Sequence, residues 1–191
     1  LNLNQRADAH RLARIYAMPL LPGVTETLRA AHARGLKLGI ASSSPHEWVD
    51  GHLRRLGLFD AFQVVLCRED VPAPKPDPAL FLSVLRALDA APQEAIALED
   101  SPNGVTAARR AGIFVVAVPN PLTAQLKLDG ENLRLGSLAE LPLDALLAKM
   151  AVGMMREPGA VRWTCRLCDT DACGRYAGGC PIGNAAAERY A

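Results

Sequence analysis

The chain has 191 residues, a length that suggests one main domain and a remainder. Half of its residues are hydrophobic and 21% are charged, which favours a packed core over a disordered chain. Lysine and arginine total 21 against 20 aspartate and glutamate residues, and this net charge of +1 argues against general binding to nucleic acid or an anionic membrane. Apolar runs such as Phe114–Val118 are far shorter than the roughly 20 residues of a membrane-spanning helix.

Between residues 17 and 150, short apolar runs alternate with longer amphipathic stretches. The expected strands are 37–41, 62–67, 95–98, 114–118 and, with a weaker pattern, 132–135. The expected helices are 23–34, 45–56, 78–88, 102–111 and 138–150. This alternation predicts an α/β domain with a doubly wound parallel sheet over residues 17–150. Residues 1–16 have the pattern of a helix, and residues 151–191 form a tail rich in glycine, cysteine and arginine.

Several helix starts carry clear signals. Ser44-Pro45-His46-Glu47 predicts an N-cap serine, a proline at the first helical position and a glutamate that completes a capping box. Asp77-Pro78 and Ser101-Pro102 repeat the cap followed by proline. Gly112 stands where a helix C-terminus favours glycine. These signals predict sharp turns from strand to helix.

Polar residues lie beyond the carboxyl ends of three of the expected strands. In an open parallel sheet, ligands bind beyond the carboxyl ends of the strands. Ser42–Ser44 follow the strand 37–41, where a small hydroxyl and the free amides of a helix start can hold an anion. Lys75 stands between two prolines, whose restricted backbone reduces the entropy lost when the loop becomes ordered. The simpler interpretations are turn and cap serines and an exposed loop lysine.

An acidic pair, Glu99-Asp100, follows the strand 95–98 and is the most informative of these features. Two adjacent carboxylates at the inner end of a buried strand repel each other and lose solvation. A divalent cation removes that cost, and Mg²⁺ prefers one or two carboxylates together with water and phosphate oxygens. The alternative is an acidic first turn that interacts with the dipole of the following helix.

Together, the hydroxyl, the lysine and the acid pair resemble the ordered motifs of the haloacid dehalogenase-like phosphohydrolase superfamily. More specifically, they resemble the branch that includes β-phosphoglucomutase and phosphatases of small phosphoesters. The matching segments are Gly39–Ser44, Lys75–Pro78, Leu98–Gly104, Ala107-Ala108 and Ala111-Gly112. The resemblance covers about residues 17–150, and the ordered set is far more specific than any one segment.

This resemblance implies a role for each matching residue. Ser42 would bind the transferring phosphoryl group, helped by the amide of Ser43, and Lys75 would bridge the phosphate and the nucleophile. Asp100 would coordinate Mg²⁺, with Glu99 assisting directly or through water. Positioning and charge neutralisation supply most of the catalysis in phosphoryl transfer, so these roles suit the chemistry. The implied substrate is a small phosphorylated metabolite such as a sugar phosphate.

The family's nucleophile, an aspartate in an Asp-x-Asp segment after the first core strand, has no counterpart before residue 36. Asp169-Thr170-Asp171 is the one Asp-x-Asp in the sequence, but no buried strand leads into it and only a circular permutation would place it correctly. Since the chain also begins with Leu1 rather than Met, we expect an N-terminal truncation, with residues 1–16 as the last helix of a helical cap. The chain alone should then be inactive, and the strands beside the missing one should expose their edges.

The tail contains four of the five cysteines: Cys165, Cys168, Cys173 and Cys180. Four thiols suit a tetrahedral Zn²⁺ site, an iron–sulfur cluster is an alternative, and reduced cysteines in a loose tail are the third interpretation. The tail is similar to the cysteine-rich tails of some MarR-type winged-helix regulators. Because the sequence shows no pattern of a winged-helix domain, we do not infer DNA binding. Without a secretion signal, we expect a reducing, cytoplasmic setting. Cys67 is expected to be a small buried hydrophobic residue.

Two functions from different classes therefore stand. The first is a Mg²⁺-dependent phosphatase or phosphomutase that lacks its nucleophile in this chain. The alternative is a non-enzymatic module in which the tail binds a metal or a partner and the α/β domain is a scaffold. Haloacid dehalogenation is less favoured, because a divalent metal serves a phosphate better than an alkyl halide.

Overall fold

The structure, a computed structural model, describes residue 13 and residues 15–154. The predicted cap helix lies almost entirely outside these residues, and so do Asp169–Asp171 and the four cysteines of the tail. Within residues 15–154, no helix is long and apolar enough to cross a lipid bilayer.

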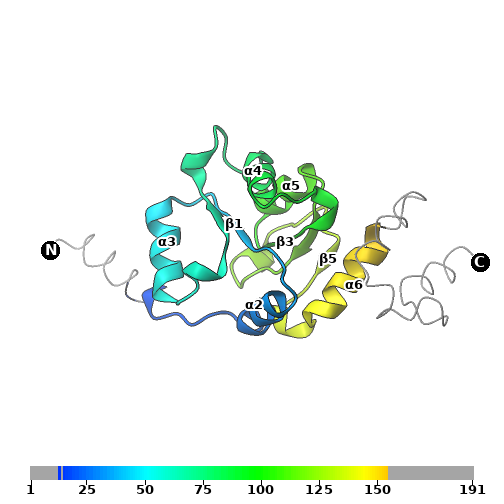
Figure 1. The fold of residues 1–191 in the computed structure, drawn as a ribbon, viewed down its shortest axis with the longest axis horizontal. Coiled ribbons are helices and arrows are strands. Elements are labelled where there is room, and N and C mark those ends of the chain that lie inside the picture. Colours follow the sequence, from blue (N-terminus) through cyan, green and yellow to red (C-terminus); the bar gives the residue numbers. More distant parts are fainter. Residues whose placement is uncertain (1–12, 14, 155–191) are drawn as a thin grey trace, which may run out of the picture.

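Helices α2–α6 and strands β1–β5 alternate along the described part of the chain, except that only a 3₁₀ turn separates β4 from β5 (Figure 1). The helices are α2 (Val24–Ala33), α3 (His46–Arg55), α4 (Ala79–Ala87), α5 (Pro102–Arg110) and α6 (Leu143–Met154). The strands are β1 (Gly39–Ala41), β2 (Val64–Leu66), β3 (Ile96–Glu99), β4 (Phe114–Ala117) and β5 (Leu133–Arg134). Short 3₁₀ helices lie between them, including η2 (Arg68–Asp70) and η5 (Leu138–Glu140).

Each predicted strand and helix between residues 17 and 150 is present, and the differences lie at the ends. Strand β2 ends at Leu66 because the amide of Cys67 donates to Asp70 Oδ2 (2.6 Å) instead of continuing the ladder. The last helix begins at Leu143 rather than at residue 138, because η5 forms a separate turn before Pro142.

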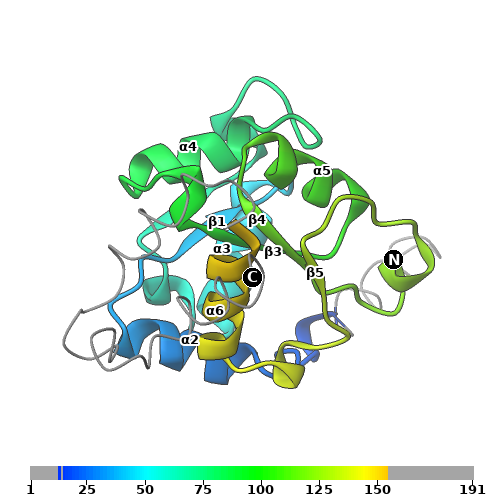
Figure 2. The ribbon, with the colours of Figure 1, turned by 90° about the vertical axis from the view of Figure 1, so that its right-hand side faces the viewer.

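All strand pairs are parallel, as predicted, but the strands form two sheets rather than one. Strand β1 pairs with β2, and β3, β4 and β5 form the second sheet with β4 in the middle. Strands β1 and β3 are neighbours in the middle of the molecule in both views (Figures 1 and 2), yet they share no ladder. Each therefore has one edge without a strand partner among the described residues.

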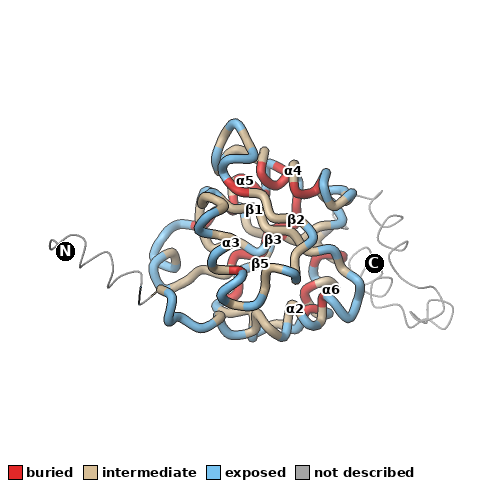
Figure 3. Tube along the Cα trace, turned by 60° about the vertical axis from the view of Figure 1, so that its left-hand side comes forward, coloured by how far each residue is buried: buried red, intermediate tan, exposed pale blue. Residues whose placement is uncertain are grey.

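Helices cover both faces of the three-stranded sheet. Helices α4 and α5 lie on one side of the strands, and α2 and α6 lie on the other (Figure 2). Every residue of β4 is buried, and its side chains alternate between the two cores. Val115 and Ala117 pack against α5, whereas Phe114 and Val116 pack towards α6. Most of the buried stretches in Figure 3 belong to these layers.

The helix-start signals are confirmed in part. Ser101 caps α5, since its Oγ accepts from the amide of Gly104 (3.1 Å), and Gly112 adopts φ = 78° after this helix. Asp77 Oδ1 accepts from the amide of Ala79 (2.9 Å), but the N-cap residue of α4 is Pro78 rather than the predicted Asp77. The predicted capping box at Ser44 is wrong: Pro45 is the N-cap residue of α3 and no side chain caps this helix. Pro45 is extended (ψ 155°), so Ser44 lies one residue too far upstream.

Candidate active site

A cavity of about 650 Å³ lies at the carboxyl ends of the strands and brings the predicted polar residues together. It is lined by Ser42–Ser44 after β1, Lys75 after β2, Glu99–Ser101 at the end of β3 and Val118–Pro121 after β4. Leu21, Pro22, Val24, Leu98 and the turn 136–138 form the more apolar part of the wall. Residues from four separate connections thus meet at one place, as the rule for open parallel sheets predicts.

The serine loop begins as a continuation of the β1–β2 ladder. The amide of Ser42 donates to Leu66 O (2.9 Å), and Ser42 Oγ then accepts from the amide of Ser44 (3.1 Å). This turn holds the hydroxyl of Ser42 at the cavity, just before the N-terminus of α3. Ser42 Oγ uses one lone pair in this bond and keeps its own proton to donate to a ligand.

Lys75 and Glu99 form a buried ion pair across the cavity. The ammonium of Lys75 donates to Glu99 Oε1, and the two side chains are only 10% and 8% exposed. Lys75 follows the two-stranded sheet, whereas Glu99 ends β3 of the other sheet. The ion pair therefore joins the two sheets at the site.

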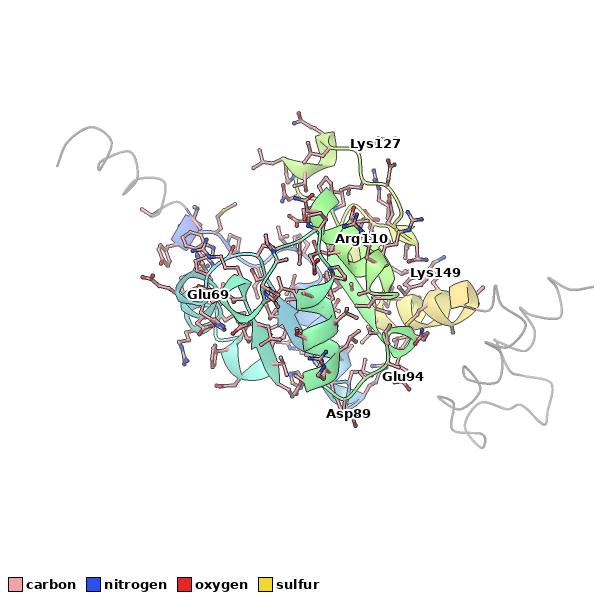
Figure 4. All side chains as sticks on the ribbon, turned by 90° about the horizontal axis from the view of Figure 1, so that it is seen from above. Glu69, Asp89, Glu94, Arg110, Lys127 and Lys149 are labelled. Atoms are coloured by element: carbon pink, nitrogen blue, oxygen red, sulfur yellow. The ribbon has the colours of Figure 1, made fainter. Side chains whose placement is uncertain are left out.

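Three neighbours hold this ion pair in place. The ammonium of Lys75 lies 4.5 Å from the ring centroid of Phe81, within range of a cation–π contact. Arg110, at the end of α5 (labelled in Figure 4), donates to the carbonyl of Pro76 (3.0 Å) and so ties down the lysine loop. Gly104 is needed for its lack of a side chain, because a Cβ there would overlap the carboxylate of Glu99.

Asp100 has a different environment from Glu99, although the two are adjacent. It is half-buried, lines the cavity, and accepts a hydrogen bond at Oδ2 from Asn120 Nδ2 (2.7 Å). No lysine, arginine or histidine forms an ion pair with Asp100 within residues 15–154. The structure thus supplies a cation to Glu99 and a neutral amide to Asp100.

This arrangement fits a Mg²⁺ ion with Asp100 as its direct protein ligand. Mg²⁺ keeps several waters and takes few protein oxygens, so one carboxylate without a cationic partner at the cavity is an adequate protein contribution. Glu99 is already bound to Lys75. Among the described residues, no cluster of three or more histidine, cysteine, aspartate or glutamate residues could hold a metal by itself.

Phe81 and Arg110 were not among the residues expected at the site, and Asn120 was expected to approach it only through ordinary loop placement. Asn120 follows β4 and lines the cavity. It lies in the loop that follows β4, just as the serines follow β1, so its place beyond the end of a strand is the signal that favours a role for it. Phe81 and Arg110 reach the lysine loop through tertiary contacts alone.

A histidine beside the serine loop connects α3 to η2. Nε2 of His46 pairs with Asp70 Oδ2 (2.7 Å), Nδ1 lies 3.5 Å from Asp50, and the His46 amide donates to Glu69 Oε1 (3.3 Å). The hydrogen bond to Asp70 raises the pKa of His46 above its ordinary value of 6.5. The backbone bond from Cys67 lowers the pKa of Asp70.

Cys67 is completely buried, as predicted for a small hydrophobic residue at a strand end. Burial, with a smaller effect of Asp50, Glu69 and Asp70, raises its pKa to about 11. The thiol therefore stays protonated at neutral pH and is a poor nucleophile.

Comparison with known proteins identifies the protein family of this chain. The sequence model of the family described as haloacid dehalogenase-like hydrolase matches residues 4–118. The chain belongs to this family, and the resemblance deduced from its motifs is confirmed.

Two similar proteins are named as phosphatases. The Bacillus subtilis (strain 168) protein YhcW is 48% identical over 126 residues, covering 66% of this chain and 57% of that protein. Hexitol phosphatase B of Escherichia coli (strain K12) is 35% identical over 130 residues, covering 68% of this chain and 59% of that protein. The chain therefore spans a little under three fifths of the length of these relatives.

Solved structures show the same fold. A mutant of CbbY from Rhodobacter sphaeroides, in complex with xylulose-(1,5)bisphosphate, superposes with a TM-score of 0.64 at 31% identity. The match covers 72% of this chain and 64% of that one. A β-phosphoglucomutase from Clostridium difficile gives a TM-score of 0.63 at 27% identity and covers 72% of this chain and 59% of that one.

Proposed function

We propose that the described domain is the phosphate- and magnesium-binding part of an enzyme that transfers a phosphoryl group from a small sugar phosphate. One observation carries the proposal: Ser42, Lys75 and Asp100, from three different connections, line one cavity. The relatives support the substrate class, since one is named a hexitol phosphatase and another was solved with a sugar bisphosphate.

Each residue has a distinct task in this proposal. The hydroxyl of Ser42 and the amide of Ser43 donate to oxygens of the phosphoryl group. Lys75 has three N–H donors and uses one for Glu99, so the others remain for phosphate oxygens. Asp100 holds Mg²⁺, and Glu99 assists through water. When bound, the metal neutralises negative charge on the phosphate, and this electrostatic contribution is a main source of catalysis in such reactions.

The attacking carboxylate is not among the described residues in this proposal. Glu99 and Asp100 are the two acidic residues that line the cavity; Glu99 is engaged by Lys75, and Asp100 would hold the metal. The free edges of β1 and β3 support the addition of one more parallel strand between them, with its end at the cavity. We propose that this chain alone binds phosphate with Mg²⁺ but forms no phosphoenzyme.

Two measurements test the proposal. Binding of inorganic phosphate to the 191-residue chain, followed calorimetrically with and without MgCl₂, should be strengthened by Mg²⁺, and Asp100→Asn should remove that coupling. Asp129→Asn, an exposed acid paired with Lys127, is the control and should keep the coupling. With p-nitrophenyl phosphate we expect no turnover. Turnover that Asp100→Asn abolishes would contradict the missing nucleophile, and phosphate binding indifferent to Mg²⁺ would favour the non-enzymatic scaffold.

Zinc binding by Cys165, Cys168, Cys173 and Cys180 is a separate proposal, which rests on the four thiolates of a closed tetrahedral site. Elemental analysis of the purified chain should find about one zinc per chain, retained in Cys67→Ala and lost in the double variant Cys165→Ser/Cys168→Ser. Iron in place of zinc would indicate a cluster, and only traces of either metal would refute a metal site in the tail.

A further inference from the structure

The side chain of Asn120 is held by a turn of its own. Its Oδ1 accepts from the amides of Leu122 (2.8 Å) and Thr123 (3.1 Å). Thr123 Oγ1 in turn accepts from the amide of Asn120 (3.0 Å). Because two backbone donors occupy the oxygen of this side chain, the nitrogen must face the other way, and there it donates to Asp100 Oδ2 (2.7 Å).

We infer that Asn120 is a positioning residue that orients the carboxylate of Asp100 for a divalent cation. The inference rests on the proposed function and adds to it a residue of the loop after β4. The bond from Asn120 engages one oxygen of Asp100, and no hydrogen bond to the other oxygen is found within residues 15–154. The carboxylate is therefore fixed in rotation while one oxygen stays available.

The hydrogen-bond partners of the two carboxylates also differ in charge. Lys75 is a cation, and its bond to Glu99 cancels the charge that Glu99 would offer to a metal. Asn120 is neutral, so it restrains Asp100 without reducing the negative charge at the cavity. A divalent cation is thus attracted to Asp100 rather than shared evenly by the pair. Hydrogen-bond partners of metal-binding carboxylates commonly act in this way, and their loss weakens metal binding about 10- to 100-fold.

The experiment measures metal affinity without any reaction. MnCl₂ is titrated into the full 191-residue chain, and the loss of the free Mn²⁺ signal in electron paramagnetic resonance gives the bound fraction. The part of the binding that Asp100→Asn abolishes belongs to this site. We expect Asn120→Ala to weaken that part about tenfold.

Variants of the turn separate positioning from folding. Thr123→Val removes the hydroxyl that accepts from Asn120 and should weaken the affinity for Mn²⁺ several-fold, while Thr123→Ser keeps the hydroxyl and should restore it. Asn132→Ala is the matched control, because Asn132 also accepts a backbone bond with its side chain, from Val115 (2.8 Å), but at the amino end of β5. It should lower the melting temperature and leave the affinity for Mn²⁺ unchanged.

The outcomes distinguish this inference from the proposed function. Asp100-dependent binding that is unchanged or tightened in Asn120→Ala overturns the inference and leaves the proposed function standing. Equal losses of affinity in Asn120→Ala and Asn132→Ala would also overturn it, because they would reflect folding alone. If the wild-type chain shows no Asp100-dependent binding, the metal site of the proposed function and the inference fail together.

Discussion

The two sheets differ sharply in how they are packed. Every residue of β4 is buried, and helices cover both faces of its sheet, whereas all residues of β1 and β2 are half-buried. Both sheets nevertheless contribute to the site. The serine loop and Lys75 follow strands β1 and β2 of the two-stranded sheet, and the acid pair lies at the end of β3 in the three-stranded sheet. The sheet β3–β4–β5 buries more apolar side chain than the sheet β1–β2, and the Lys75–Glu99 ion pair connects the two at the site.

The largest expected effect is at that connection. Lys75→Met leaves Glu99 buried without its partner, which costs about 3–5 kcal/mol of unfolding free energy. Urea unfolding of the 191-residue chain measures the loss. The double variant Lys75→Met/Glu99→Gln removes the unpaired buried charge of Glu99 and should recover most of the stability. If the single variant is as stable as the wild type, the ion pair does not join the sheets.

A matched pair of valines compares the sheets directly. Val115→Ala in β4 creates a cavity in a fully buried position and should cost about 2–3 kcal/mol. Val65→Ala in β2 is half-buried and should cost about 1 kcal/mol. Chemical denaturation monitored by circular dichroism gives both values, and equal losses would show that the difference in burial has no energetic counterpart.

A smaller effect concerns the close contact at the end of β3. Gly104→Ala places a Cβ against the carboxylate of Glu99, so either the helix α5 or the ion pair has to shift, at a cost of about 1–3 kcal/mol. Gly51→Ala, where a Cβ meets open space within α3, is the control and should be neutral or slightly stabilising. Thermal unfolding of the two variants measures the change in stability. If Gly104→Ala leaves the stability unchanged, the side chain of Glu99 has room to move.

The smallest expected effect is the pH dependence of the contact between α3 and η2. The pKa of His46 is raised in the folded chain, so its contribution is fully present below the ordinary value of 6.5 and is lost as the pH rises through the raised value. Because the side chain is 37% exposed, solvent screening limits the effect to about 0.5 kcal/mol. The stability difference between wild type and His46→Gln should therefore be largest below pH 6.5 and should shrink as the pH rises through the raised pKa of His46. His32→Gln, at the exposed end of α2, is the control, and a difference that grows with pH would contradict the assignment.

Local patterns were sufficient for much of this protein. The positions of the strands and helices followed from hydrophobic periodicity, and the cap at Ser101 followed from a serine before a proline. The three motifs and the family also followed from the sequence, because the serines and the acid pair stand at the ends of strands, Lys75 lies in the loop after the strand between them, and parallel strands bring such ends to one edge.

Long-range contacts decided the rest. No local pattern could show that the strands split into two sheets, or that Lys75 and Glu99, 24 positions apart, form an ion pair that leaves Asp100 to a neutral amide. The capping box at Ser44 was wrong because the backbone of Pro45 is extended there. A residue's neighbours along the chain determine its secondary structure through the backbone and local burial, but the partner of a charge depends on which loops meet in space. That meeting is a property of the tertiary structure alone.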